Sequence, residues 1–160
     1  MVRALEPVLD IVALAAPPLW VAVVHPQIEV KTKDARKVLP PTVPLGLAVR
    51  QWANVAGLVA GFLTTDYELI GRSLDDYIVE PARAALIPGL AEARTRALAA
   101  GAVGGGISGS GPSIFMLNRT EATAQAVGAA MGSVFAELGI EFNVYVGPVA
   151  PEGARVVAEE

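Results

Sequence analysis

The residues of this chain that are best suited to chemistry gather in one stretch, GGGISGSGPSIF, at residues 104–115. Glycine has no Cβ, so its backbone turns tightly and approaches other surfaces closely. Ser108 and Ser110 place hydroxyl groups between the glycines. Successive amide N–H groups in such a loop form a concave site for an anion, most often a phosphate. The composition therefore predicts either a phosphate-contacting loop or a tight turn between two strands.

The stretch does not fit the two best-known phosphate-binding motifs. Gly104, Gly106 and Gly109 match G-x-G-x-x-G, but that motif requires a helix directly after the glycines. Here Pro112 and an apolar, strand-like run follow instead. Gly111 also lacks the Lys-Ser/Thr pair that completes a Walker A loop. These departures argue against a dinucleotide site and against a Walker A site.

Other catalytic or metal-binding residue types are scarce. The chain has no cysteine, and its single histidine, His25, is expected at the end of a strand in a structural or solvated role. Asp75 and Asp76 are adjacent, so on a helix they point about 100° apart and make a poor pair of metal ligands. A solvated surface or a helix end is the favoured interpretation. We therefore expect no metal site and identify no catalytic residue in this chain.

Composition and charge limit the classes of function. A chain of 160 residues with 53% hydrophobic residues predicts a single domain with its own core. The net charge of −4 argues against nucleic acid as a partner. The absence of cysteine fits a cytoplasmic protein. Residues 45–63 are apolar, but Arg50, Gln51 and Asn54 lie among them, so we expect a buried amphipathic helix and no membrane association.

Periodicity predicts an α+β fold. Two strands, at residues 9–15 and 19–24, are expected to be joined by a proline turn. Helices are expected at residues 32–36, 45–62, 67–74, 80–87, 90–100 and 120–138, and further strands at residues 113–117, 140–146 and 153–157. Packing such helices on one face of a mostly antiparallel sheet gives a ferredoxin-like sandwich.

Three segments in order carry a resemblance to a known family. GGGISGSGPSIF resembles the third conserved motif of the GHMP small-molecule kinases. HPQIEVKTKDARKVLP, at residues 25–40, and DYIVEPARAALIPGL, at residues 76–90, resemble homoserine kinases within that superfamily. GARVV at residues 153–157 matches as well, so the similarity covers the chain from about Leu19 onward.

The resemblance implies ATP- and Mg²⁺-dependent phosphorylation of L-homoserine to O-phospho-L-homoserine in threonine biosynthesis. It places substrate-binding arginines at Arg36 and Arg83, where a planar guanidinium can clasp the substrate carboxylate through two hydrogen bonds. It assigns an active-site glycine loop to Gly106, Ser108, Gly109, Ser110 and Gly111. The alternative is that Arg36 and Arg83 are solvated surface residues.

One part of the family pattern has no counterpart in this chain. Members of the family carry an N-terminal domain with a P-x-x-x-G-L-G-S-S-A-A-like loop that holds ATP, and the nearest string here, at residues 44–48, lacks the serines. We therefore expect a single C-terminal domain, with the main residues for ATP and Mg²⁺ elsewhere and little activity alone. Its expected partners are a missing N-terminal domain or a split-gene partner, and further copies of itself in a homo-oligomer. A non-catalytic binding or dimerisation module and another GHMP kinase are the alternatives.

Overall fold

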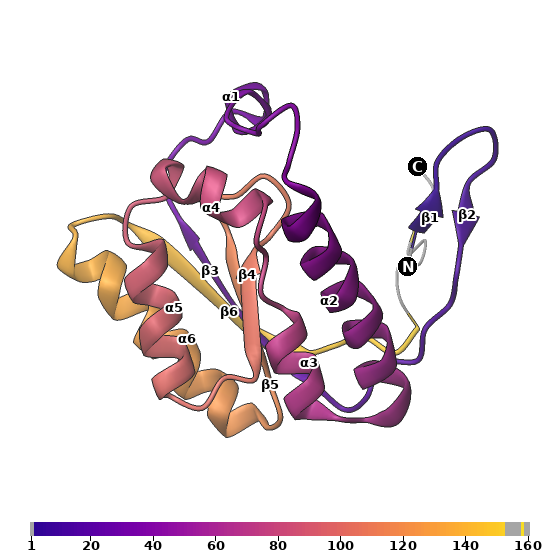
Figure 1. Cartoon of the computed structure of the whole chain (residues 1–160). Coiled ribbons are helices and arrows are strands. Elements are labelled where there is room, and N and C mark those ends of the chain that lie inside the picture. Colours follow the sequence, from indigo (N-terminus) through magenta and orange to yellow (C-terminus); the bar gives the residue numbers. More distant parts are fainter. Residues whose placement is uncertain (1, 153–157, 159–160) are drawn as a thin grey trace.

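The core of the protein is a four-stranded antiparallel sheet with the strand order β4-β5-β3-β6 (Figure 1). The computed structural model describes residues 2–152 and 158. The strands are β3 (Trp20–Pro26), β4 (Gly104–Ile107), β5 (Ile114–Asn118) and β6 (Phe142–Pro148). β3 lies in the middle, where Ala22 is opposite Met116 on one side and Val146 on the other. The predicted α+β fold with an antiparallel sheet is confirmed.

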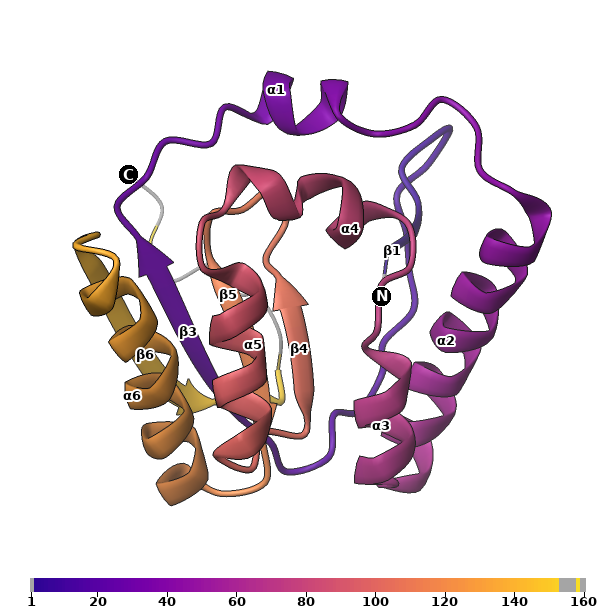
Figure 2. The same ribbon diagram turned by 60° about the vertical axis from the view of Figure 1, so that its left-hand side comes forward.

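Two helices, α5 (Leu90–Ala99) and α6 (Glu121–Glu137), cover one face of this sheet (Figure 2). Because strand side chains alternate between faces, Ala22, Ile114 and Met116 point to the same side and are fully buried against these helices. α6 begins where the Thr120 hydroxyl accepts a hydrogen bond from the Thr123 N–H, and its bounds agree with the helix predicted at residues 120–138. This face holds the larger part of the core.

A second pair of helices, α2 (Leu45–Thr64) and α3 (Tyr67–Ser73), contacts the opposite face of the sheet. Leu19, Ile70 and Leu117 form a smaller buried cluster there. The two helices are separate because Thr65 adopts a left-handed conformation at φ 57° and the Asp66 carboxylate caps α3. The sheet therefore has helices on both faces, with the larger core under α5 and α6.

Three short helical segments lie at the end of the sheet where the glycine-rich turn is found (Figure 2). They are α1 (Thr32–Lys37), α4 (Val79–Arg83) and the 3-10 helix η1 (Ala84–Leu86). α1 follows β3, whereas α4 follows α3, so segments about 50 residues apart in sequence meet at this end. This meeting point contains most of the predicted site residues.

The predicted strand at residues 9–15 is wrong for most of its length. Only β2 (Asp10–Ile11) is extended, and it pairs with β1 (Val2–Ala4) in a separate two-stranded sheet. β3 has no free edge to receive another strand, because β5 and β6 occupy both sides of it. The predicted strand at residues 153–157 lies outside the described residues.

The prediction that the apolar stripe of residues 45–62 is buried is also wrong for the first half of the stripe. The helix forms as α2, but Leu45, Val49, Trp52 and Val55 are between 51% and 72% exposed. Leu58 and Phe62, further along the helix, are partly buried against the smaller cluster, so the first half of the stripe is the exposed part. None of the described helices is long and apolar enough to span a membrane.

Candidate functional site

The glycine-rich stretch divides into a strand and a turn. Gly104, Gly105 and Gly106 belong to β4, and residues 108–113 connect it to β5. The turn closes through hydrogen bonds from the Ser108 N–H to the Ser113 carbonyl at 2.8 Å and from the Gly111 N–H to the Ser108 carbonyl at 3.0 Å. The tight turn between two strands, one of the two alternatives from sequence, is therefore present.

Glycine is required at two positions of this turn by the backbone. Gly109 has φ 60° and Gly111 has φ 83°, values that residues with a Cβ rarely adopt. Among the described residues, the N–H groups of Gly109 and Ser110 have no hydrogen-bond acceptor. The turn therefore leaves two adjacent backbone donors available to an anion.

Arg83 connects two of the predicted elements of the site. It is the last residue of α4 and is half-buried. Its Nη1 donates to the Gly109 carbonyl at 2.7 Å, and its Nε donates to the Ala35 carbonyl of α1 at 3.1 Å. A guanidinium has five N–H donors, so these two contacts leave others for a carboxylate or phosphate. The Arg83 side chain is therefore held in place by α1 and by the glycine-rich turn.

Arg36 directly follows Ala35, the residue of α1 whose carbonyl accepts the hydrogen bond from Arg83. The Arg36 side chain is exposed and has no hydrogen bond or ion pair within residues 2–152. The Arg83–Ala35 hydrogen bond brings the backbone of α1 to Arg83 and the turn. The structure thus brings together Arg83, the glycine turn and the segment that carries Arg36.

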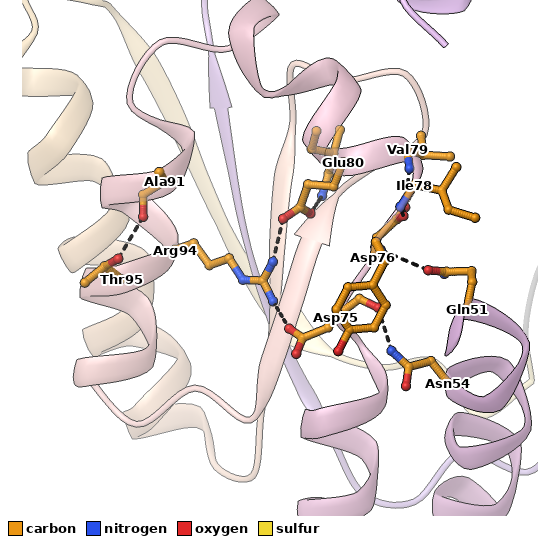
Figure 3. A network of polar contacts seen from close by, with 12 residues as sticks. Gln51, Asn54, Asp75, Asp76, Ile78, Val79, Glu80, Ala91, Arg94 and Thr95 are labelled. Carbon is orange, nitrogen blue, oxygen red and sulfur yellow. Dashed lines mark hydrogen bonds and ion pairs between the residues drawn. The ribbon is translucent and has the colours of Figure 1, made fainter. Parts of the chain in front are cut away.

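A cavity of about 240 Å³ lies next to Arg83. Its lining combines polar groups of α2, α4 and the segment before α4 with the glycines of β4 and the turn. It includes Gln51, Asp76, Glu80, Gly106 and Gly109. Asp76 lies at a helix end, as favoured from sequence, because its Oδ1 accepts hydrogen bonds from the N–H groups of Ile78 and Val79 at 2.8 Å (Figure 3). The cavity could admit a small polar molecule.

Sequence reasoning missed Glu80 and Arg94, which form an ion pair beside this cavity at 2.5 Å (Figure 3). Arg94 also pairs with Asp75. The two partners of Arg94 come from different elements, and nothing in the local sequence around Arg94 indicates them. A signal did exist for Gln51 and Asn54, because two polar residues three apart in an apolar helix share a face and need polar partners.

His25 connects β3 to the glycine-rich turn. It lies at the end of β3, and its Nδ1 is 2.8 Å from the Ser113 hydroxyl, at the far end of the glycine-rich turn. Within the described residues, no group of three or more histidine, aspartate or glutamate side chains is arranged to hold a metal ion. His25 therefore helps to anchor the turn.

The chain is similar to homoserine kinases along nearly its whole length. It is 45% identical over 161 residues to the homoserine kinase of Chlorobaculum tepidum, covering 99% of this chain and 49% of that one. It is 46% identical to the homoserine kinase of Chloroherpeton thalassium, with coverage of 98% and 50%. The chain therefore spans about half the length of the curated relatives it matches.

Solved structures agree with this similarity. The homoserine kinase from Cytophaga hutchinsonii superposes with a TM-score of 0.88 at 52% identity, covering 91% of this chain and 46% of that one. The mevalonate kinase of L. major superposes with a TM-score of 0.71 at 14% identity over 96% of this chain and 49% of that one, which shows a shared fold alone. The family model described as GHMP kinases C terminal matches residues 58–137, which include α4, α5, the glycine strand and turn, and α6. The chain therefore belongs to the GHMP kinase C-terminal domain family.

Proposed function

We propose that this chain is the substrate-side half of a homoserine kinase, which transfers the γ-phosphoryl group of ATP to the side-chain hydroxyl of L-homoserine. The observation that carries the proposal is Arg83, which donates hydrogen bonds to both the glycine turn and α1 and keeps further donors available beside a cavity. The similarity to homoserine kinases along the chain supports the choice of substrate. The product is O-phospho-L-homoserine, an intermediate of threonine biosynthesis.

In this proposal, Arg83 and Arg36 bind the substrate carboxylate. A planar guanidinium forms two parallel hydrogen bonds to a carboxylate, which fixes the orientation of the substrate as well as its position. The free N–H groups of Gly109 and Ser110, with the hydroxyls of Ser108 and Ser110, then face the region of the transferred phosphoryl group. Phosphoryl transfer depends mainly on positioning and on stabilisation of charge, so backbone donors beside two arginines are suitable parts.

We further propose that ATP and Mg²⁺ are bound mainly by an N-terminal half that belongs to the same or to a partner chain. The described residues contain no acidic cluster suited to a metal, and the chain spans about half the length of its relatives. The exposed apolar stripe on α2, formed by Leu45, Val49, Trp52 and Val55, is the surface we assign to that half. Exposed apolar patches of this kind mark interaction sites.

Reconstitution tests the proposal. The 160-residue chain and a separately produced ATP-binding half of a homoserine kinase are mixed, their association is measured by sedimentation, and O-phosphohomoserine is quantified by mass spectrometry. We expect product in the mixture and little from either half alone. Associated halves that form no product would contradict the proposal. If the chain instead forms homo-oligomers that bind neither homoserine nor ATP, it is better described as a non-catalytic dimerisation module.

Two substitutions test the site within a complete enzyme that contains this chain. Arg36→Ala and Arg83→Ala should each raise KM for homoserine. Arg72→Ala is a matched control, because Arg72 is exposed on α3 and has no polar partner within residues 2–152. Unchanged kcat/KM in both site variants would refute the clasp.

A further inference from the structure

Glu80 is an unusually confined carboxylate. Its side chain is 12% exposed, Oε1 accepts a hydrogen bond from Arg94 at 2.5 Å, and Oε2 accepts one from the Ile107 N–H at 3.3 Å. A Cβ added to Gly106 would come within 2.5 Å of Oε2. The absence of a side chain at Gly106 therefore makes room for this carboxylate against the glycine strand.

Burying this carboxylate requires compensation. A buried carboxylate is unfavourable unless it is paired with a cation and its oxygens accept hydrogen bonds, and removing one partner of a buried pair leaves the other charge without compensation. Arg94, which is 23% exposed and lies on α5, supplies the cation. The pair thus connects α4, α5 and the glycine strand, three elements that are distant in sequence.

The same arginine holds the segment that leads into α4 (Figure 3). Arg94 pairs with the carboxylate of Asp75, whose backbone carbonyl accepts a hydrogen bond from Asn54 of α2 at 2.7 Å. Two residues further on, the Tyr77 N–H donates to the Gln51 side chain of α2 at 2.9 Å. The segment before α4 is therefore held from α2 on one side and from α5 on the other.

α4 depends on these contacts for its orientation. It has five residues, which is too short for a stable isolated helix. It carries Glu80 and Arg83, three residues apart, so the first anchors the helix while the second contacts Gly109 and Ala35. Because Glu80 and Arg83 lie one turn apart on the same short helix, a shift of Glu80 also moves Arg83.

We propose that Glu80 and Arg94 are positioning residues that hold the Arg83 guanidinium in place for the substrate carboxylate. The inference rests on the proposed function for the identity of the ligand. Neither residue needs to touch the substrate, because both act through α4 and the glycine strand. A small misplacement of a binding group is enough to lower catalytic efficiency markedly.

The test uses a complete enzyme containing this chain, with Glu80→Gln and Arg94→Met as variants and Glu92→Gln as the control. Glu92 lies on the same helix as Arg94 and pairs with Arg96 in an exposed ion pair away from the cavity. We expect KM for homoserine to rise about tenfold or more in the two test variants, with KM for ATP unchanged. Arg94→Lys, which keeps the charge but loses the forked geometry, should give a smaller rise.

A double substitution separates positioning from general destabilisation. If Glu80 acts through Arg83, Glu80→Gln should raise KM for homoserine no further when Arg83→Ala is already present. An equal additional rise in the Arg83→Ala background would overturn the inference. So would an unchanged KM in both Glu80→Gln and Arg94→Met.

A second readout does not depend on the substrate. In the 160-residue chain, hydrogen exchange of residues 104–111 should be faster in Glu80→Gln than in the unsubstituted chain, while exchange in α6 stays the same. Equal exchange of residues 104–111 in the two proteins would refute the anchoring of the glycine strand. Lack of homoserine phosphorylation by the unsubstituted complete enzyme would refute the proposed function alone, so the two failures are distinguishable.

Discussion

Gly106→Ala tests how closely the glycine strand and α4 are fitted. The new methyl group would lie within 2.5 Å of Glu80 Oε2, which is too close for the carboxylate to keep its position. Because Oε2 accepts from the Ile107 N–H and Oε1 from Arg94, moving the carboxylate weakens both contacts. We therefore expect Gly106→Ala to lower both stability and affinity for homoserine.

The magnitude follows from the contacts. A hydrogen bond to a charged group contributes about 1.5–3 kcal/mol, and alanine in place of glycine in a strand regains about 0.5–1 kcal/mol. The free energy of unfolding should therefore fall by about 0.5–2.5 kcal/mol. For a chain of 160 residues, a loss of that size lowers Tm by about 1–10 °C.

Thermal unfolding followed by circular dichroism measures this effect, with Gly46→Ala as the control. A Cβ at Gly46 would meet no atom within 4 Å, and alanine is the better helix former, so Tm should rise slightly. In a Glu80→Ala background the steric conflict is removed, so Gly106→Ala should cost little more. A Gly106→Ala protein that is as stable as the unsubstituted chain would refute the reasoning.

Two further predictions concern the packing of α6 and its ion pair with α5. Gly128→Ala on α6 should lower Tm, because a Cβ at Gly128 would lie 2.8 Å from Val144 Cγ1 in β6. Gly46→Ala, the control, should not lower Tm, and equal Tm changes in the two variants would contradict this packing. Hydrogen bonds from Arg96 lower the pKa of Glu137, so the ion pair stabilises the fold at neutral pH. This stabilisation is lost as the pH falls below the ordinary glutamate pKa of about 4.3 and then through the lowered pKa of Glu137 in the folded state. Glu137→Gln should therefore lower Tm at pH 7 and have no effect at acidic pH, and a Tm difference that persists unchanged in acid would exclude this pair as its source.

Much of the fold was predictable because its signals are local. The signals of α6 lie within 20 residues, from the Thr120 cap to Gly139 with its positive φ, and the helix forms within the predicted residues 120–138. The glycines of β4 were misleading, because glycine composition favours loops, yet Gly105 and Gly106 pair with Met116 and Phe115 in the sheet. Their strand conformation depends on the partner strand, which periodicity cannot identify.

The candidate site was predictable only in part for the same reason. Arg83 and the glycine turn follow from family-like segments, and the structure places them in contact. The ion pair of Glu80 and Arg94 spans two helices and a turn, so neither residue carries a local signal of the other. The exposed stripe of α2 was predicted to be buried, because a hydrophobic pattern does not show which surface packs against it.

The most direct test of the proposed function is the choice of phosphoryl acceptor by a complete enzyme containing this chain. With ATP and Mg²⁺ present, kcat/KM is measured for L-homoserine, mevalonate and phosphomevalonate, in the unsubstituted enzyme and in Arg83→Ala. We predict that homoserine is strongly preferred and that Arg83→Ala lowers kcat/KM for homoserine by about 10²-fold, since one or two charged hydrogen bonds are lost. Preference for another acceptor, or a homoserine kcat/KM that does not change in Arg83→Ala, would contradict the account.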